Sequence, residues 1–437
     1  MTELHKIVVV GGGAGGLELV TALGNRLGRR HRAEVTLIDA EWTHIWKPLL
    51  HEVAAGTLDV SDHELEYLAQ ARRHHFRFRL GCVDGVDRET RRVWLAPTFN
   101  DQQQEITPRR SFPYDTLVFA VGSVTNDFGI KGVRKYCRVL DTTRQAQRFQ
   151  QELLGRLLHA HAQGGPKSPG ELDIAIVGGG ATGVELSAQL YDVTRQLSAY
   201  GLDEIRPAEH MRLHIIQAGP RLVPALPERL SQATLEALQG LGIEVHCNRR
   251  VIEVTAEGVR TDDGGFIPAA LKLWAAGIKA PDFLAAIDGL ETNKFNQVLV
   301  NRSLQTTVDA TIYAFGDCAA CPLDDSDELV PPRAQAAHQQ ASFLARALPA
   351  VILRGKPSPD YRYRDYGSLV ALGRYTTVGN LMGNLLGNVT VSGFLARMVY
   401  LSLYQMHQIA LHGWIRTALL TLSSLLQHRL NPRIKLH

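Results

Sequence analysis

The sequence predicts an α/β fold with two parallel sheets, because one pattern of strand, glycine-rich loop and helix occurs twice. The pattern appears as "VVVGGGAGGLE" at residues 8–18 and as "IVGGGATGVE" at residues 176–185. In both copies a short, continuous apolar run is typical of a strand buried on both faces of a parallel sheet. Glycines in G-x-G-x-x-G spacing then allow a tight turn and close approach of a pyrophosphate to the helix N-terminus. We therefore predict two Rossmann-like dinucleotide-binding domains.

The first copy is a complete βαβ unit. Its elements are, in chain order, a strand at Lys6–Val10, the glycines Gly11, Gly13 and Gly16, a helix at Leu17–Leu27, and a strand at Glu34–Ile38 that leads to Asp39. A lone glycine motif is weak support for a nucleotide site, but an acidic residue at the end of the returning strand supplies the acceptor that a ribose hydroxyl needs. This context predicts a nucleotide site in the first copy.

The second copy has the same parts but a different last residue. Its elements are a strand at Asp173–Val177, the glycines Gly178, Gly180 and Gly183, a helix at Val184–Leu197, and a strand at Arg212–Ile216 that leads to Gln217. A Gly/Pro-rich stretch at residues 163–171 precedes this unit and indicates an interdomain linker. The sequence thus predicts a second nucleotide site in which an amide replaces the carboxylate.

Bulk composition limits the class of protein. The chain has 437 residues, 45% of them hydrophobic, which is enough for two or three domains with full cores. A net charge of only +3 gives no electrostatic case for nucleic acid as a partner. The five cysteines are mostly scattered, which suits a reducing compartment rather than a disulfide framework. The N-terminus enters a strand at once, so we expect no export signal.

Two further strand ends complete a known architecture. "YDTLVFAVGS" at 114–123 and "TIYAFGDCA" at 311–319 are apolar strands that end in Ala-Val-Gly and Gly-Asp. With the two loops, they resemble two-dinucleotide-binding-domain flavoproteins, in which the first domain binds FAD and the inserted second domain binds NAD(P)H. The resemblance implies an FAD domain from residues 1–130 and 285–350, an NAD(P)H domain over 131–284, and a C-terminal region over 351–437.

A finer resemblance covers essentially the whole chain. The stretches "HIWKPLLHEVAAG", "LKLWAAGIKAPDFL", "PPRAQAAHQQ" and "YLSLYQMHQIALHGW" are similar, in this order, to those of bacterial type II (non-proton-pumping) NADH:quinone oxidoreductases. The resemblance implies an FAD enzyme that oxidises NADH and reduces a membrane quinone. It also implies a peripheral protein, a homodimer, at the cytoplasmic face of the bacterial inner membrane.

The resemblance also assigns cofactor contacts. For FAD the residues are Gly11, Gly13, Gly16, Asp39, Lys47, Val83, Ala120, Gly122 and Asp317, and for NADH they are Gly178, Gly180, Gly183, Gln217, Ala276 and Gly277. Lys47 would support the negatively charged reduced flavin, although a lysine that only marks the loop before Pro48 explains the sequence equally well.

Three polar residues are candidates for the catalytic step. Gln335 and Gln339 match the family's A-Q-x-A-x-Q signature, which implies a place near the quinone head and the flavin. The alternative is that Ala and Gln simply favour a helix. Glu185 lies two residues after Gly183, where the family has a Glu between the nicotinamide and quinone pockets. We expect it to assist proton delivery, although an acid in a first helical turn also complements the helix dipole. Glu18, at the equivalent place in the first unit, we interpret as structural.

Gln217 bears on the choice of donor. A carboxylate there accepts ribose hydroxyls and repels a 2′-phosphate, whereas an amide removes the repulsion. Arg221 is close enough in sequence to meet a phosphate. We therefore expect NADH as the main donor and consider NADPH usable; the alternative is that Gln217 binds NADH and changes nothing else.

Cys318 and Cys321 form a C-x-x-C pair that overlaps the Gly-Asp motif. A zinc site needs a second ligand pair, which the sequence does not show, so we expect no metal and a packing role for Cys318. A sulfide:quinone oxidoreductase shares the scaffold but needs paired cysteines at the flavin, and Cys137 and Cys318 are poor candidates. A membrane-attached NADH-binding redox sensor is the other alternative.

The tail differs from the rest of the chain in charge. Residues 366–437 contain no Asp or Glu, and their basic residues include Arg374, Arg397, Arg416, Arg429, Arg433 and Lys435. The apolar runs between them are shorter than the ~20 residues that span a bilayer. They favour amphipathic helices that lie in the interface, with the cations drawn to anionic lipid. This predicts a C-terminal membrane-association region; a dimerisation helix is the alternative.

Overall fold

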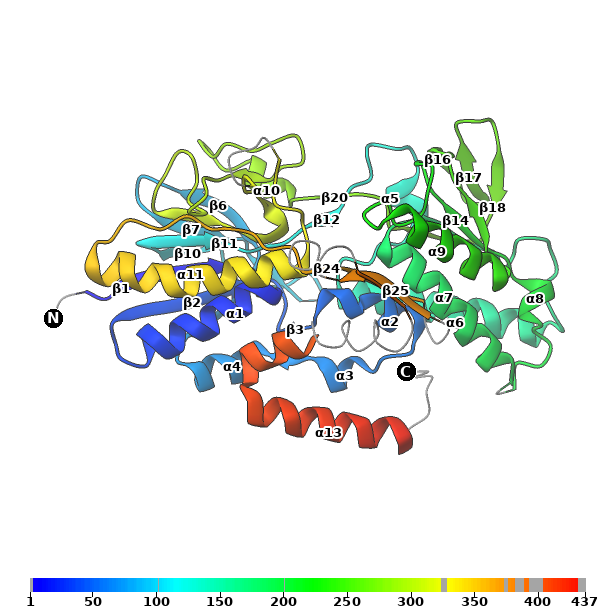
Figure 1. The fold of residues 1–437 in the computed structure, drawn as a ribbon, viewed down its shortest axis with the longest axis horizontal. Helices are drawn as coiled ribbons and strands as arrows, with labels where there is room; N and C mark the ends of the chain where they lie inside the picture. Colours follow the sequence, from blue (N-terminus) through cyan, green and yellow to red (C-terminus); the bar gives the residue numbers. More distant parts are fainter. Residues whose placement is uncertain are drawn as a thin grey trace.

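The computed structural model describes residues 3–100, 102–199, 201–323, 328–372, 376–381, 389–392 and 404–430. Two parallel sheets form its centre, one for each glycine-rich loop (Figure 1). The first sheet has the order β22-β11-β1-β2-β5, with bounds Ile312–Ala314, Thr116–Phe119, His5–Val10, Ala33–Asp39 and Arg77–Leu80. The second has the order β15-β14-β13-β19, with bounds Glu244–His246, Leu213–Ile216, Ile174–Val177 and Leu271–Trp274.

The chain leaves the first sheet and returns to it. Strand β22 pairs in parallel with β11, Leu117 opposite Ile312, although the whole second sheet lies between them in sequence. The pair β12 (Val124–Thr125) and β20 (Ile278–Lys279) joins the outgoing and returning segments. Each glycine-rich loop follows the carboxyl end of the first strand of its sheet. The segments that contain β12 and β20, which cross between the two sheets, therefore pass near both loops.

Helices cover the sheets and fill the space between them. They are α1 (Ala14–Leu23), α2 (Leu50–Ala55), α3 (Val60–His63), α4 (Tyr67–His74), α5 (Val133–Tyr136), α6 (Thr143–Ala162), α7 (Ala181–Ala199), α8 (Pro207–His210), α9 (Glu228–Gly240), α10 (Asp282–Ala285), α11 (Ala334–Arg354) and α13 (Trp414–Leu430). Helix α11 lies along α1, and α2 packs on α6 and α7 (Figure 1). A further helical segment spans residues 404–412.

Smaller antiparallel elements surround the two sheets. Their strands are β3 (Thr43–His44), β4 (Leu65–Glu66), β6 (Val83–Asp87), β7 (Arg92–Leu95), β8 (Thr98–Phe99), β9 (Glu105–Thr107), β10 (Arg110–Pro113), β16 (Val251–Val254), β17 (Gly258–Thr261), β18 (Phe266–Pro268), β24 (Gly367–Leu372), β25 (Thr376–Leu381) and β26 (Val389–Ser392). Strands β21 (Val298–Leu299) and β23 (Ala319–Ala320) pair in parallel. Short helical turns are η1 (Gly24–Gly28), η2 (Lys47–Leu49) and η3 (Gly316–Cys318).

The first helix is shorter than the sequence suggests. We predicted a regular helix at Leu17–Leu27, but α1 begins at Ala14 and ends at Leu23, and a wider turn follows at Gly24–Gly28. An added Cβ on Gly24 would lie 2.1 Å from the carbonyl oxygen of His74, and one on Gly28 would lie 2.1 Å from that of His75. The two glycines therefore let the chain pass against α4, which the helical period alone does not show.

The C-terminal region is described in part. Strands β24 and β25 lie between the two sheet regions, β24 against α7 and β25 against α9, and α13 lies at the bottom of the view (Figure 1). Of the predicted basic residues, Arg374, Arg397, Arg433 and Lys435 lie outside the described residues, as does the side chain of Arg429. Among the helices that the structure describes, none is long and apolar enough to cross a bilayer.

Candidate active site

The first glycine-rich loop is packed too closely for side chains at two of its glycines. Gly11 has φ +99°, and an added Cβ there would lie 2.5 Å from the Ala120 carbonyl oxygen. An added Cβ on Gly16 would lie 1.9 Å from the Gly11 carbonyl oxygen. At Gly13 an added Cβ would meet nothing within 4 Å. The loop is therefore tight toward the sheet and open at the helix N-terminus, as a bound pyrophosphate requires.

Asp39 holds this loop in place. Its Oδ2 accepts a hydrogen bond of 2.5 Å from the Gly12 N–H, and its Oδ1 accepts one of 2.8 Å from the Glu41 N–H. Burial raises the pKa of the Asp39 carboxyl, and the backbone hydrogen bonds oppose this shift. The predicted acidic residue is thus at the end of β2 beside the loop.

The second loop repeats this construction with Gln217. Gly178 has φ +117°, and an added Cβ would lie 2.6 Å from the Ala275 carbonyl. An added Cβ on Gly183 would lie 2.1 Å from the Gly178 carbonyl oxygen, whereas at Gly180 it would meet nothing within 4 Å. The Gln217 Oε1 accepts a hydrogen bond of 2.9 Å from the Gly179 N–H, the same bond that Asp39 makes in the first loop.

Arg221 is not directed at this loop's ligand space. Its guanidinium donates hydrogen bonds to the carbonyl oxygens of Leu226 at 2.8 Å and Pro224 at 2.9 Å, and to the Ser231 hydroxyl at 3.3 Å. The N–H groups of Arg221 therefore stabilise the loop before α9. The expectation that Arg221 meets a 2′-phosphate has no support in this geometry.

Ala276 and Gly277 lie where the second sheet leads into the crossing segment. The Trp274 indole donates to the carbonyl oxygens of Asn126 and Ala276, at 2.9 and 3.0 Å. Gly277 has φ +71°, and an added Cβ would lie 2.3 Å from the Phe128 ring. The predicted nicotinamide-side residues are thus packed against the outgoing chain of the first domain.

Lys47, Ser123 and Asp317 come together from three distant segments. The Lys47 ammonium donates to the Ser123 carbonyl oxygen at 2.7 Å, and the Ser123 hydroxyl donates to Asp317 Oδ2 at 2.8 Å. Burial raises the pKa of Asp317, while the Ser123 hydrogen bond and the nearby Lys47 charge oppose it. The Lys47 charge thus opposes part of the shift at Asp317, and the same ammonium lies 3.5 Å from Asp141 Oδ1.

The remaining predicted FAD contacts are Ala120, Gly122 and Val83. Ala120 follows β11 and donates its N–H to the Val10 carbonyl oxygen at 2.8 Å. Gly122 has φ +67°, with nothing within 4 Å of an added Cβ. Val83 begins β6 and is partly buried against the core of the first domain. Two of these positions are thus close to the loop, and Val83 lies on the neighbouring sheet.

The glutamines of α11 hold backbone segments. Gln335 donates from Nε2 to Asp365 Oδ1 at 3.1 Å and accepts from the Tyr366 N–H at 3.2 Å. Gln339 pairs with Arg364 in both directions, at 2.8 and 3.0 Å. The adjacent Gln340, which the sequence analysis did not single out, accepts the Gly316 N–H at 2.8 Å and so fixes the Gly-Asp turn.

Glu185 is buried at the start of α7. One of its carboxylate oxygens lies 3.7 Å from Nδ1 of His51 on α2, and both side chains are less than a tenth exposed. Burial lowers the pKa of His51 to about 4, so this histidine is neutral at pH 7. The structure thus places a buried acid beside the second loop, with a neutral imidazole as neighbour.

Glu18 has a more extensive network. Its two oxygens accept hydrogen bonds of 2.7 Å from Nδ1 of His338 on α11 and from Nδ1 of His407 on the 404–412 helix. His407 Nε2 lies 2.9 Å from His44 Nε2, and His44 Nδ1 donates to the Gly12 carbonyl oxygen at 2.9 Å. This chain of contacts connects the first loop, α1, α11 and the C-terminal region, which is consistent with the interpretation of Glu18 as structural.

The charges in this network follow from burial and hydrogen bonding. Burial alone would raise the pKa of Glu18, but hydrogen bonds from His338 and His407 outweigh it and hold the pKa below its usual value. The Glu18 hydrogen bond raises the pKa of His338. Burial lowers the pKa of His44 to about 3, so its ring is neutral. Because its Nδ1 donates to the Gly12 carbonyl oxygen, its Nε2 accepts the hydrogen bond from His407 Nε2.

The cysteine pair is buried. Cys318 and Cys321 are both buried, and burial raises the pKa of each thiol to about 12. The Cys318 Sγ–H donates to the Phe315 carbonyl oxygen at 3.2 Å. Because the thiolate is the reactive form, these groups are poor candidates for redox chemistry or metal binding.

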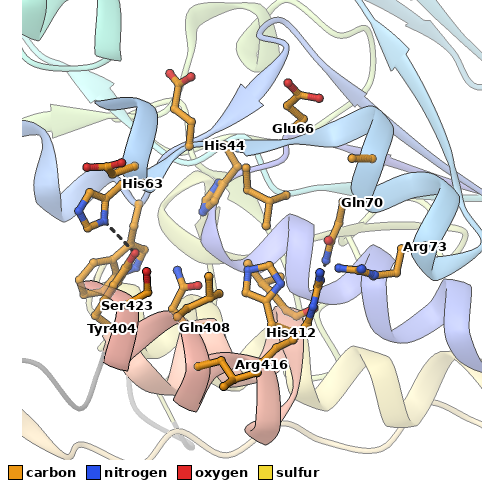
Figure 2. A pocket seen from close by; sticks show the side chains of 18 of the residues that line it. His44, His63, Glu66, Gln70, Arg73, Tyr404, Gln408, His412, Arg416 and Ser423 are labelled. Atoms are coloured by element: carbon orange, nitrogen blue, oxygen red, sulfur yellow. Dashed lines mark hydrogen bonds between the residues drawn. The ribbon is translucent and has the colours of Figure 1, made fainter. Parts of the chain in front are cut away.

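A groove of about 1110 Å³ lies between the first domain and the C-terminal helices. Figure 2 shows His63, Glu66 and Gln70 on one wall and Tyr404, Gln408 and Arg416 on the other. His63 Nδ1 is 3.2 Å from the Tyr404 hydroxyl, which connects the two walls. The groove does not contain the predicted catalytic residues.

The chain is similar to known redox proteins along nearly its whole length. A sequence profile of the pyridine nucleotide-disulphide oxidoreductases matches residues 5–341. A type II NADH:quinone oxidoreductase of Haemophilus influenzae is 44% identical, over 99% of this chain and 100% of that protein. One of Staphylococcus aureus is 26% identical, over 87% and 90%.

Solved structures show the same fold. NDH2 of Plasmodium falciparum in complex with NADH has a TM-score of 0.81 at 20% identity, over 99% of this chain and 100% of that one. The sulfide:quinone oxidoreductase of Aquifex aeolicus has a TM-score of 0.71 at 17% identity, over 94% and 92%. From its fold and its full-length similarity, the chain belongs to the pyridine nucleotide-disulphide oxidoreductase family and, within it, to the type II NADH:quinone oxidoreductases.

Proposed function

We propose that this protein is an FAD-dependent enzyme that transfers electrons from NADH to a membrane quinone without pumping protons. The observation that carries the proposal is the full-length 44% identity to a type II NADH:quinone oxidoreductase, in a chain with two intact dinucleotide loops. NADH bound at the second loop and FAD bound at the first explain why the chain has two dinucleotide loops. The buried cysteines speak against a disulfide or sulfide reaction.

The residues of the first domain fit FAD. The open space at Gly13 and Gly122 is what a pyrophosphate and ribityl chain need, and a side chain at either position would fill it. Asp39 and Asp317 offer carboxylate oxygens near the two ends of this space. Bound there, FAD supplies a flavin that takes a hydride and passes electrons on singly or in pairs. The protein orients the donor and excludes water.

The second loop is proposed to bind NADH. Gln217 retains an oxygen and an amide N–H₂ at the position where a ribose is recognised, so it can bind hydroxyl groups. Gln217 has no charge to repel a 2′-phosphate. The Arg221 guanidinium, however, is hydrogen-bonded to the carbonyl oxygens of Leu226 and Pro224 and does not offer the phosphate a positive partner. We therefore propose NADH as the main donor and NADPH as a poorer one.

Glu185, Gln335 and Gln339 are proposed to serve the quinone step. Glu185 is buried in α7, which begins at Ala181, so it lies beyond the first helical turn in which the sequence predicted it. Its role is to hold or deliver a proton for the reduced quinone. Gln335 and Gln339 hold the segment 364–366 on α11 by hydrogen bonds, and we propose that the quinone head binds near this helix.

The groove and α13 are proposed to face the membrane. Trp414, Ile415 and Leu419 on this helix are 77%, 82% and 61% exposed, an arrangement that costs free energy in water but not at a lipid interface. Arg72, Arg73 and Arg416 line the groove and are suited to anionic headgroups. We propose a peripheral protein at the cytoplasmic face of the bacterial inner membrane, as a homodimer.

The two half-reactions test the proposal. With the FAD-replete protein under anaerobic conditions, we expect NADH to bleach the flavin absorbance and a short-chain ubiquinone to restore it. Sodium sulfide serves as the alternative donor and should leave the flavin oxidised. If sulfide bleaches the flavin, or if quinone fails to reoxidise it, the proposed donor or acceptor is wrong.

A further inference from the structure

The edge of the second sheet carries three potential metal ligands. Strands β14 and β15 pair in parallel, with His214 opposite Glu244 and Ile216 opposite His246. Side chains two positions apart on a strand share a face, so Glu244 and His246 project to the side on which His214 lies. The sequence analysis found no metal-ligand array, because the only local signal is Glu-x-His and the third ligand is 30 positions away from Glu244.

The distances among the three groups match those of a coordinated ion. His214 Nδ1 lies 3.3 Å from His246 Nε2 and 3.3 Å from Glu244 Oε2, and His246 Nε2 lies 3.8 Å from the same oxygen. Two ligands at 2.0–2.1 Å from a tetrahedral zinc ion are separated by about 3.3 Å. Three donor atoms that already face one another at this spacing need little movement to bind an ion.

We propose that His214, Glu244 and His246 form a binding site for a divalent transition-metal ion of the Zn²⁺ type. Two imidazole nitrogens and one carboxylate oxygen are a common zinc donor set, and a water completes the fourth position. The His214 side chain is only 4% exposed and the His246 side chain 19%, whereas that of Glu244 is 47% exposed. An ion therefore approaches from solvent past Glu244 to the more buried nitrogens.

The arrangement of the donor atoms favours an ion over a simple ion pair. Both imidazole nitrogens and the Glu244 carboxylate oxygen face one another, so a cation at the centre satisfies all three groups at once. His214 Nε2 has no hydrogen-bond partner among the described residues, so the outer shell is incomplete. We therefore expect weaker binding than at a structural zinc site.

The site is connected to the second glycine-rich loop. The His246 carbonyl oxygen accepts a hydrogen bond of 2.9 Å from the Gln217 N–H, and the Gln217 side chain accepts the Gly179 N–H. An ion that fixes His246 therefore also restrains the residue that holds the loop. We infer that occupancy changes the apparent affinity for the dinucleotide; this consequence rests on the proposed function, but binding itself does not.

Calorimetric titration of the full-length, FAD-replete protein with Zn²⁺ tests the site. The variants are His246→Ala, which removes one ligand, and Glu244→Gln, which is exposed and keeps the shape. His159→Ala, an exposed histidine on α6, is the matched control for the loss of one imidazole. We expect one equivalent of Zn²⁺ in the wild type and in His159→Ala, none at the same concentration in His246→Ala, and roughly tenfold weaker binding in Glu244→Gln.

The possible results bear separately on the metal site, on its link to the loop and on the proposed function. Zn²⁺ binding that is equal in the wild type and His246→Ala overturns the site and means that the ion binds elsewhere. Co²⁺ provides a second readout, since four-coordinate binding gives visible absorption bands that His246→Ala must lose. If Zn²⁺ binds as expected but the KM for NADH does not move, the link to the loop is wrong while the site stands. Absence of quinone turnover would contradict the proposed function and leave the metal result unaffected.

Discussion

The two dinucleotide units have the same backbone and different chemistry at two equivalent positions. In each loop a side-chain oxygen at the end of the second strand accepts a backbone hydrogen bond from a loop glycine. Asp39 accepts the Gly12 N–H in the first unit, and Gln217 accepts the Gly179 N–H in the second. In each helix a buried glutamate follows the third glycine by two residues. Glu18 accepts hydrogen bonds of 2.7 Å from two histidine nitrogens, and an oxygen of Glu185 lies 3.7 Å from Nδ1 of the neutral His51.

The difference shows which parts of the motif are required by the fold. The loop needs an acceptor and room at its glycines, and either a carboxylate or an amide supplies the acceptor. The charge of this acceptor can therefore differ between the two units. The first unit uses its glutamate to attach the C-terminal region, while the second leaves its acid beside the donor site.

Glu18→Gln breaks the first unit's network and has the largest expected effect. An amide cannot accept the two 2.7 Å histidine hydrogen bonds as a carboxylate does, so we expect a loss of roughly 3–5 kcal/mol in the free energy of unfolding, as for a broken buried ion pair. Urea unfolding of the full-length protein at pH 7 measures it. Glu185→Gln is the matched control, with a much smaller expected loss. Equal losses in the two variants would refute the division of roles.

The same network predicts a pH dependence. The folded pKa of Glu18 is depressed, so its contribution is present above the unfolded value of about 4.5 and is lost as the pH falls through the folded value. The folded pKa of His338 is raised, so its contribution is full below about 6.5 and is lost as the pH rises through the folded value. Stability from this pair is therefore greatest between these two values, and Glu18→Gln should flatten the profile.

Gly183→Ala and Gly180→Ala separate the two requirements of the second loop. A Cβ at residue 183 collides with the Gly178 carbonyl, whereas one at residue 180 only occupies ligand space. We expect both to lower kcat/KM for NADH by roughly 100-fold, which corresponds to about 2.7 kcal/mol. Only Gly183→Ala should also lower the Tm. FAD content should not change in either variant, and its loss in both would mean that the units are not independent.

Glu185→Gln tests the acid of the second unit. Removal of a positioned proton donor should slow quinone reduction by roughly 10- to 100-fold while NADH still bleaches the flavin at its normal rate. Stopped-flow spectroscopy separates these steps, and the wild-type pH profile of the slow step should flatten in the variant. Turnover that stays intact at every pH would remove Glu185 from the mechanism.

Gln217→Glu gives the second unit the charge that the first unit has. The added carboxylate should lower kcat/KM for NADPH relative to NADH by roughly tenfold, or about 1.4 kcal/mol. Arg221→Ala is the control and should leave the ratio unchanged, because its guanidinium is bound to the Leu226 and Pro224 carbonyl oxygens. A drop in the NADPH rate with Arg221→Ala would show that this arginine reaches the phosphate.

The local features of the site were predictable from sequence. Strand, loop and helix follow one another within about 30 residues in each unit, so their order alone indicates the two loops and the acceptors at Asp39 and Gln217. The strands of the first unit were predicted to within one residue. The first helix begins three residues before its predicted start and ends at Leu23, where Gly24 and Gly28 pass against the end of α4.

The partners of these residues were not predictable. Glu18 meets His338 and His407, which are more than 300 positions away, and the fold alone decides such contacts. The same is true of Gln340 at the Gly-Asp turn and of His214 beside Glu244. Single-residue signals cannot distinguish Gln340 from its neighbours Gln335 and Gln339, because all three lie on one helix rich in alanine and glutamine.

The most direct test of the account is steady-state reduction of a short-chain ubiquinone by the purified, FAD-replete protein, with NADH and NADPH measured side by side. The account predicts quinone-dependent oxidation of both donors, with kcat/KM for NADH higher by at least roughly tenfold. Rapid flavin reduction without quinone-dependent turnover by either donor would contradict it, since the second unit would then deliver electrons to some acceptor other than a quinone.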